Sequence, residues 1–177
     1  MAKTMKYSAL ISLVIFGLSF GRNLSLCITF GTISYHLVMR LVVGTAFDRL
    51  MGNRADTSRP WYRIRPWEEK IYKKLRVKSW KGRMPSYAPE LFSPEKHSWG
   101  EIAQAMCQAE LVHETIIVLS FLPLLAAIPF GSFPVFFITS LASAAFDLLF
   151  VIMQRYNRPR ILRLHQEPVP PDPSEHH

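Results

Sequence analysis

A carboxylate and an imidazole lie three residues apart in an apolar stretch of the second half of this chain. They are Glu110 and His113, in the string AELVHE, and on a helix they would share one face. A carboxylate beside an imidazole can fix the tautomer of the ring and raise its basicity, which suits a general base. The alternative is an interfacial polar pair that only anchors the start of a helix. The two residues alone leave both interpretations open.

The same pair raises the question of a metal site. Glu-x-x-His is half of a di-iron carboxylate site, in which two helices each contribute such a motif. The sequence holds no second copy, so we expect no metal and no other bound cofactor.

A second polar pair lies inside an earlier apolar stretch. His36 and Arg40 are four residues apart in YHLVMR and would also share a helix face. A charged side chain deep in a bilayer costs about 2.5–3.5 kcal/mol on insertion scales. Arg40 could extend to the headgroups, or it could bind a phosphate or carboxylate of a substrate together with His36. Asp147, in the last apolar stretch, is its most obvious counter-ion within the chain.

A third polar cluster, QRYNRPR, follows the last apolar stretch. Arginine after a membrane span is ordinary topology. This density of amide, phenol and guanidinium groups is less ordinary, because it offers planar donors for a phosphate or a carboxylate. The candidate binding residues in the cluster are Gln154, Arg155, Tyr156, Asn157, Arg158 and Arg160.

These residues lie in or next to two apolar blocks, residues 7–47 and 111–153, and most of the charged residues lie between and after these blocks. Such segregation indicates a protein embedded in a bilayer rather than a soluble core. The first segment is shorter than the roughly 20 residues that a helical span needs, so it could be re-entrant or interfacial. We predict an all-α integral membrane protein with about four transmembrane helices, at residues 7–20, 24–47, 111–128 and 133–153.

The segment between the second and third helices, residues 48–108, is basic and rich in tryptophan and tyrosine. Because these aromatic residues favour the headgroup layer, we expect this segment to lie on the membrane surface. A short helix is predicted at residues 67–75, with Pro66 near its start and two glutamates in its first turn. Residues 84–94 hold three prolines and should form a loop, and a helix from about Trp99 should continue into the third span.

The distribution of charge predicts the orientation. The net charge is +8, with thirteen Lys or Arg against five Asp or Glu in residues 49–96, whereas the two predicted outer turns share one basic residue, Arg22. The positive-inside rule places both termini and residues 48–108 on the cytoplasmic side of the cell inner membrane. No nucleic-acid motif occurs, so the expected partners are membrane lipids and a lipid or glycolipid substrate, with partners in a membrane complex also open.

The chain is predicted to form a single membrane domain over residues 1–164, followed by a disordered tail at 165–177. The apolar start could be a signal peptide. However, residues 21–23 are a poor cleavage region and a second apolar segment follows at once, so we expect a retained signal anchor. P-loop and GxGxxG motifs are absent, as is the His-x4-Asp motif of glycerolipid acyltransferases.

Three stretches together resemble a known family. They are VKSWKGRMP, AELVHE and MQRYNRPRILRL, at residues 77–85, 109–114 and 153–164. The chain resembles the small membrane acyltransferases typified by glycosyl-4,4'-diaponeurosporenoate acyltransferase, which acts late in the synthesis of staphyloxanthin-type carotenoids. The likeness covers about residues 70–164 and maps the family patterns onto Glu110 and His113, onto the QRYNRPR cluster, and onto Trp80 and Lys81.

The resemblance implies transfer of a fatty acyl group to a hydroxyl of a glycosylated carotenoid or similar glycolipid. His113, oriented by Glu110, would remove the acceptor proton, and Arg40, Arg155 and Arg158 would hold the phosphates of the donor or stabilise the oxyanion. The donor could be acyl-CoA, acyl carrier protein or a phospholipid.

Two departures from the family pattern add carboxylates near this site. Glu114 stands where the family often has tryptophan, and Asp147 stands where it often has asparagine. The rival interpretation is a non-enzymatic accessory or assembly subunit of a membrane complex, whose polar residues would face its partners. A metal-dependent membrane oxidoreductase would need more ligands near Glu110 than the sequence provides.

Overall fold

A computed structural model of the chain describes residues 2–85 and 88–166, and within these ranges every regular element is helical. The predicted all-α membrane architecture is thereby confirmed. The elements are α1 (Ala2–Ser19), α2 (Leu24–Met51), η1 (Pro60–Tyr62), α3 (Pro66–Lys74), α4 (Val77–Trp80), η2 (Lys81–Arg83), η3 (Pro89–Phe92), α5 (Trp99–Leu119), η4 (Leu122–Ala126), α6 (Ala127–Phe130) and α7 (Phe133–Gln166).

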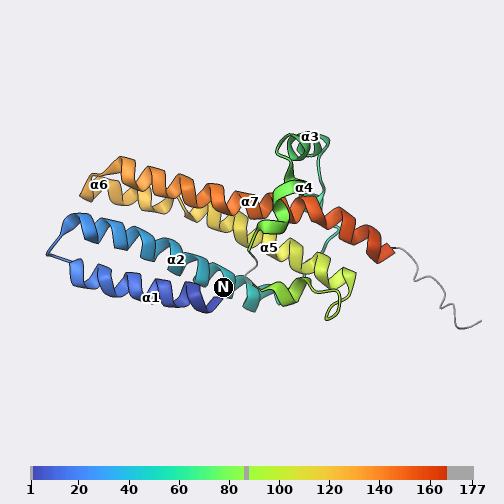
Figure 1. Cartoon of the computed structure of the whole chain (residues 1–177), viewed down its shortest axis with the longest axis horizontal. Coiled ribbons are helices and arrows are strands. Elements are labelled where there is room, and N and C mark those ends of the chain that lie inside the picture. Colours follow the sequence, from blue (N-terminus) through green and yellow to red (C-terminus); the bar gives the residue numbers. More distant parts are fainter. Residues whose placement is uncertain (1, 86–87, 167–177) are drawn as a thin grey trace, which may run out of the picture.

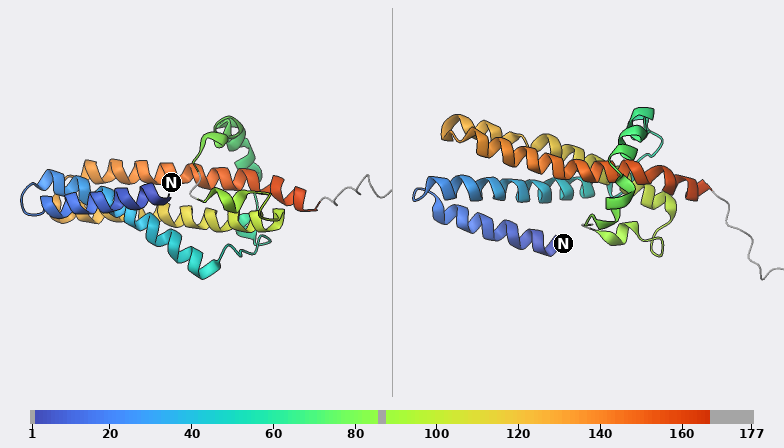
Figure 2. Two further views of the ribbon diagram at one scale, coloured as in Figure 1. Left: turned by 60° about the horizontal axis from the view of Figure 1, so that its bottom comes forward. Right: turned by 45° about the horizontal axis from the view of Figure 1, so that its top comes forward.

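Two helical hairpins form the body of the molecule (Figure 1). The first joins α1 to α2, and the second joins α5, through η4 and α6, to α7. Their turns lie at the same end of the molecule and use glycines with positive φ, Gly21 at +72° and Gly131 at +66°. The segment between α2 and α5, with α3 and α4, lies at the other end. Figure 2 shows α2 lying between α1 and the α5–α7 pair. One side of α2 contacts α1, and the opposite side contacts α5 and α7.

Local capping explains where the helices begin and end. The Asn23 side chain accepts a hydrogen bond from the backbone N–H of Leu26 at 3.0 Å, which starts α2. Gly52 ends α2 in the left-handed conformation, with φ +54°. Ser98 and Glu101 form a reciprocal capping box that starts α5. The predicted continuation of a helix from Trp99 into the third span is confirmed, as is the short helix predicted at residues 67–75, which is Pro66–Lys74 in the structure.

Prolines shape the second hairpin in two different ways. The helix α5 ends at Leu119, and Pro123 lies in the 3₁₀ turn η4 that replaces the expected end of the third span. In α7, by contrast, the helix continues through Pro159 to Gln166, well beyond the expected end at residue 153. Proline removes one helical hydrogen bond, but the flanking Arg155 and Arg158 are held by side-chain contacts. The tail is predicted at residues 165–177; residues 165 and 166 belong to α7 instead, and residues 167–177 lie outside the described residues.

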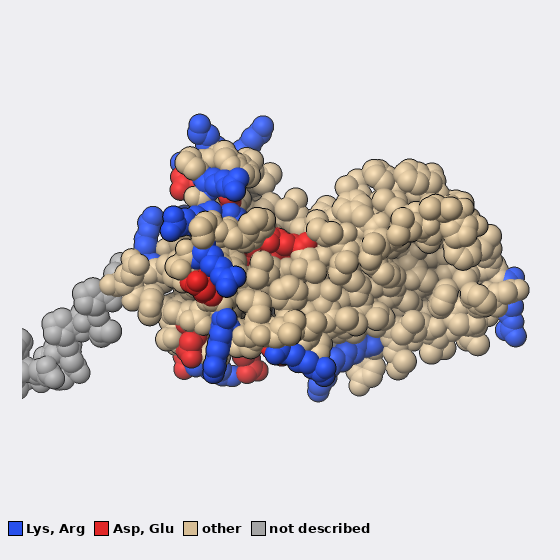
Figure 3. All heavy atoms as spheres, turned by 180° about the vertical axis from the view of Figure 1, so that it is seen from behind, with Lys and Arg blue, Asp and Glu red and all other residues tan. Residues whose placement is uncertain are grey.

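Three helical stretches are long and apolar enough to cross a membrane: Leu24–Met51, Trp99–Phe130 and Phe133–Gln166. The helix α1 is not among them, so a crossing by the first segment stays a prediction. Figure 3 shows lysine, arginine, aspartate and glutamate gathered mainly at one end of the molecule, around the segment between α2 and α5. Most of the remaining surface in that view carries no charge. The chain is therefore an integral membrane protein with one strongly charged end.

Candidate functional site

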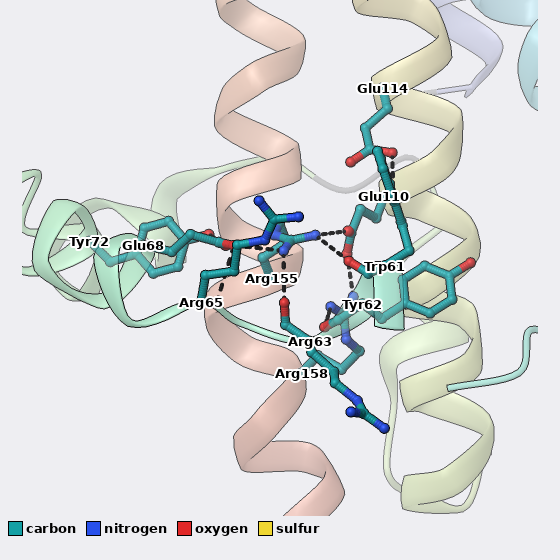
Figure 4. A network of polar contacts seen from close by, with 10 residues as sticks. All are labelled: Trp61, Tyr62, Arg63, Arg65, Glu68, Tyr72, Glu110, Glu114, Arg155 and Arg158. Atoms are coloured by element: carbon teal, nitrogen blue, oxygen red, sulfur yellow. Dashed lines mark hydrogen bonds and ion pairs between the residues drawn. The ribbon is translucent and has the colours of Figure 1, made fainter. Parts of the chain in front are cut away.

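The most extensive polar network joins α5, α7 and the segment before α3 (Figure 4). Glu110, on α5, is fully buried, and its two carboxylate oxygens accept hydrogen bonds from Arg155 and Arg158, on α7. Arg158 is also buried and donates to the backbone carbonyl of Tyr62, in η1. The structure thus brings Glu110 together with two of the arginines that the sequence singled out.

All five N–H groups of the Arg155 guanidinium are used inside the protein. Two of them donate to the Glu68 carboxylate, each at 2.8 Å, and one donates to Glu110. The other two donate to the backbone carbonyls of Trp61 and Arg63, both at 3.1 Å. Arg155 therefore has no donor left for a ligand in this conformation.

Glu68 anchors α3 to this network. Its carboxylate accepts a hydrogen bond from the Tyr72 hydroxyl at 2.7 Å in addition to those from Arg155. Burial by itself would raise the pKa of the Glu68 carboxyl, but the hydrogen bonds from Arg155 and Tyr72 and the charge of Arg155 outweigh burial and lower that pKa. Burial and the bond to Glu68 raise the pKa of the Tyr72 phenol. At neutral pH the contact is therefore a charged carboxylate held by neutral and cationic donors.

This network fixes the surface segment against the bundle. Its three elements are far apart in the sequence, with Glu68 on α3, Glu110 on α5, and Arg155 and Arg158 on α7. Removing one partner of a buried ion pair leaves an uncompensated charge and typically costs about 3–5 kcal/mol. The network, called the arginine clamp below, consists of Glu68, Glu110, Arg155 and Arg158.

A second network surrounds His113, one helical turn from the arginine clamp. The Nδ1 atom of His113 lies 2.8 Å from Oδ1 of Asp147, on α7, and Asp147 is 1% exposed. The imidazole also stacks on Phe150, with ring centroids 4.5 Å apart and planes 6° apart. The His113 side chain is 22% exposed, and Nε2 forms no hydrogen bond with any described residue. A histidine held at Nδ1 by a buried carboxylate and open at Nε2 has the geometry of a general base.

The structure corrects the expected pairing of His113 with Glu110. Both oxygens of Glu110 are taken by Arg155 and Arg158, and the carboxylate that contacts His113 is Asp147. The cause is the antiparallel packing of α5 on α7. The turn of α5 that carries Glu110 faces Arg155 and Arg158, whereas the next turn, which carries His113, faces Asp147.

Arg40, on α2, is the second partner of the Asp147 carboxylate. Its guanidinium forms an ion pair with the Asp147 carboxylate, so the counter-ion expected from the sequence is confirmed. The same guanidinium donates to the Ser143 hydroxyl at 2.8 Å, and Ser143 lies within 2.9 Å of the Ser120 hydroxyl. The three long helices α2, α5 and α7 therefore meet at Asp147.

His36 lies one turn before Arg40 on α2 and is 8% exposed. Neither of its ring nitrogens has a hydrogen-bond partner among the described residues. Its ring packs edge-on against Tyr35, at 5.4 Å between centroids. His36 forms no hydrogen bond with Glu110 or His113, and its backbone carbonyl accepts one from Arg40 at 3.3 Å.

The rest of the QRYNRPR cluster lies nearer the charged end. Asn157 accepts a hydrogen bond from the Lys81 ammonium, in η2. Two cations lie close to the Tyr156 ring, Lys81 at 5.1 Å and Arg160 at 4.7 Å from its centroid. Gln154 is buried on α7, and the Trp80 indole donates to the carbonyl of Leu75.

Lys81 and Arg160 pair with no carboxylate among residues 2–85 and 88–166. Burial lowers the pKa of the Lys81 ammonium, and the charges of Arg160 and Lys78 lower it further. An anion placed here would relieve this repulsion. This basic cluster, Lys78, Lys81 and Arg160, is therefore better suited to bind a phosphate or carboxylate than the saturated Arg155.

The sequence analysis missed two roles in the networks: Glu68 as a partner of Arg155, and Asp147 as the partner of His113. Glu68 looked like an ordinary acid in the first turn of a helix, and no sequence signal linked it to Arg155. Asp147 was a carboxylate inside an apolar span, and such residues are rare enough to mark a functional site. Glu114, the other unusual carboxylate, accepts a hydrogen bond from the Trp61 indole at 3.0 Å.

Comparison with known proteins identifies a family. The model of the glycosyl-4,4'-diaponeurosporenoate acyltransferase family matches residues 58–167, which is more than half of the chain and includes every residue of the arginine clamp. No curated protein and no solved structure matches. The α1–α2 hairpin lies before the matched region.

Proposed function

Because the chain belongs to the glycosyl-4,4'-diaponeurosporenoate acyltransferase family, we propose that it transfers a fatty acyl group to a hydroxyl of a glycosylated carotenoid or a similar membrane glycolipid. The observation that carries this proposal is the contact between His113 and Asp147 beside Arg40. His113 is then a base whose Nδ1 is held by Asp147 and whose Nε2 is free to accept a proton. It lies in the membrane body, where a lipid acceptor would lie.

In the proposed reaction, Nε2 of His113 accepts the proton of the acceptor hydroxyl as the oxygen attacks the acyl carbonyl carbon. A new C–O bond forms and the carbonyl oxygen becomes negatively charged. When that intermediate collapses, the bond to the donor breaks and His113 returns the proton to the departing group. Asp147 holds Nδ1–H throughout and stabilises the imidazolium, while Arg40 keeps the Asp147 carboxylate compensated.

We assign the other residues different parts in this scheme. Arg155 and Arg158 hold α3, α5 and α7 together, because their donors are used by Glu68, Glu110 and backbone carbonyls. Lys81, Asn157 and Arg160 are assigned to the polar group of the acyl donor, because they lie at the charged end without a carboxylate partner.

The direct test uses the purified chain in phospholipid vesicles with a labelled acyl thioester and a glycosylated carotenoid. The expected product is the acyl ester of the sugar, identified by mass spectrometry, and it should form in proportion to the amount of protein. If neither a thioester nor a phospholipid donor yields this ester, the accessory-subunit interpretation becomes the better one.

A further inference from the structure

An apolar crevice separates the two hairpins at the end of the molecule that carries their turns. Its volume is about 410 Å³, within the usual range of ligand pockets. Phe16, Phe20 and Ile28 line it from the first hairpin, and Leu125, Phe130 and Phe136 line it from the second. It lies far from the charged end, between α1 and helices that are long and apolar enough to cross a membrane.

The inner wall of the crevice is closely packed. Gly31 has no side chain, so the Phe16 ring packs directly on α2, at a distance where an added Cβ would lie 3.0 Å from the ring. Tyr35 lines the crevice next, and its hydroxyl donates to the carbonyl of Leu119 at 2.7 Å, which ties α2 to the end of α5. Both hairpins therefore hold the walls in place.

The crevice, the base and the basic cluster follow one another along the bundle. Leu119 is six residues beyond His113 on α5, which corresponds to about 9 Å along the helix axis. In the opposite direction, Arg160 lies thirteen residues beyond Asp147 on α7, or about 20 Å. An amphiphile lying along α2, α5 and α7 with its polar end at the basic cluster would therefore place its middle near His113 and its tail in the crevice.

We propose that this crevice binds the fatty chain of the acyl donor and sets the chain length that the enzyme accepts. This inference rests on the proposed function. Its occupant is the donor chain because an acyl group whose carbonyl lies at His113 must extend away from the charged end, and the crevice is the apolar space in that direction. Seven of its thirteen lining residues come from the first hairpin, before the family-matched residues 58–167, so both hairpins set the size of the crevice.

The first experiment fills the crevice. In Ala126→Phe a ring is added at a lining position, whereas in the control Ala142→Phe the same ring is added to an exposed position of α7 outside the lining. Transfer from octanoyl and palmitoyl thioesters is compared for both variants and the native chain. We expect Ala126→Phe to lower kcat/KM for palmitoyl relative to octanoyl, because the added ring occupies space that only the longer chain needs. The control should keep the native ratio.

Other outcomes overturn the proposal. An unchanged palmitoyl-to-octanoyl ratio with a higher KM for the acceptor would mean that the acceptor occupies the crevice. Unchanged constants for both substrates would mean that ordinary bilayer lipid fills it.

A second experiment does not depend on turnover. A palmitoyl thioester with a diazirine near the end of its chain is photolysed with the native chain in phosphatidylcholine vesicles, and labelled peptides are mapped by mass spectrometry. Labels should fall on residues 16–35 and 122–136, should decrease with excess palmitoyl-CoA, and should decrease in Ala126→Phe but not in Ala142→Phe. Labelling spread over the outer faces of α1 and α7, without competition, would contradict the proposal even if acyl transfer occurs. Specific labelling of the crevice without any acyl transfer would contradict the proposed function but would support the crevice as a binding site for a fatty chain.

Discussion

At the scale of single residues, Glu110 and His113 occupy neighbouring turns of α5 but belong to different networks. Glu110 is fully buried against Arg155 and Arg158, whereas His113 is partly exposed and contacts Asp147. The first arrangement is suited to holding the fold together, and the second is suited to moving a proton. Substitutions at the two positions should therefore have different consequences.

For Glu110 we expect a loss of stability rather than of chemistry. Glu110→Gln removes the buried negative charge that pairs with Arg155 and Arg158. The free energy of unfolding should therefore fall by about 3–5 kcal/mol. The thermal unfolding midpoint in detergent should fall, while turnover per folded molecule stays near that of the native chain. Glu90→Gln, which affects only an exposed ion pair with Lys96, is the matched control. A stable Glu110→Gln protein with very low turnover would reverse this assignment.

For Asp147 the substituent decides the outcome. Asp147→Asn keeps an oxygen that can accept from Nδ1–H of His113 but loses the ion pair with Arg40. Asp147→Ala loses both contacts. Transfer rates measured per folded protein should therefore decrease in the order native, Asp147→Asn, Asp147→Ala. Equal rates for the two variants would show that Asp147 does not orient the ring.

For Lys81 the expected effect is on donor binding. Lys81→Ala should raise the KM for the acyl donor and leave the KM for the glycolipid unchanged, because Lys81 lies in the basic cluster at the charged end. Steady-state kinetics with each substrate varied in turn would separate the two constants. Lys96→Ala, at an exposed ion pair, serves as the control. A raised KM for the glycolipid acceptor alone would show that the basic cluster binds the acceptor and not the acyl donor.

At the scale of elements, much of the architecture follows from local sequence signals. Asn23, Pro66 and Ser98 mark helix starts that the structure contains, because capping and the fixed φ of proline act within one helical turn. The partner of His113 could not be predicted in this way, since it depends on how α5 packs against α7. The extension of α7 through Pro159 depends likewise on contacts with distant residues.

The attachment of α3 should depend on pH through Glu68. The pKa of Glu68 in the folded protein lies below its ordinary value of 4.5, so the contact stabilises the folded state above that value and is lost as the pH falls through the lower folded pKa. The thermal midpoint should therefore fall as the pH is lowered past this range. Glu68→Gln should flatten that part of the profile, while Glu69→Gln, at an exposed neighbour, should not. An identical acid profile for Glu68→Gln and the native chain would contradict this role.

At the scale of the whole molecule, both hairpin turns lie at one end and the segment rich in Lys and Arg lies at the other. The positive-inside rule predicts that the charged end faces the cytoplasm. Single cysteines at Thr57 and Ser132, in a background without the native cysteines, should react with membrane-impermeant reagents from opposite sides. Labelling of both positions from the same side would exclude this orientation.

The same arrangement orders the proposed substrate path along the bundle. The basic cluster, His113 and the apolar crevice follow one another from the charged end to the turns. At its centre, His113 is proposed to be the base in acyl transfer and to be positioned by Asp147.

The most direct measurement is the turnover of His113→Ala per folded molecule, with a labelled acyl thioester and a glycosylated carotenoid in vesicles. General base catalysis is typically worth about 10²–10⁴-fold, so the variant should be slower by about that factor while its thermal midpoint stays near the native value. His97→Ala, at a partly exposed histidine in the loop before α5, should keep native turnover. Near-native turnover by a well-folded His113→Ala protein would contradict the account.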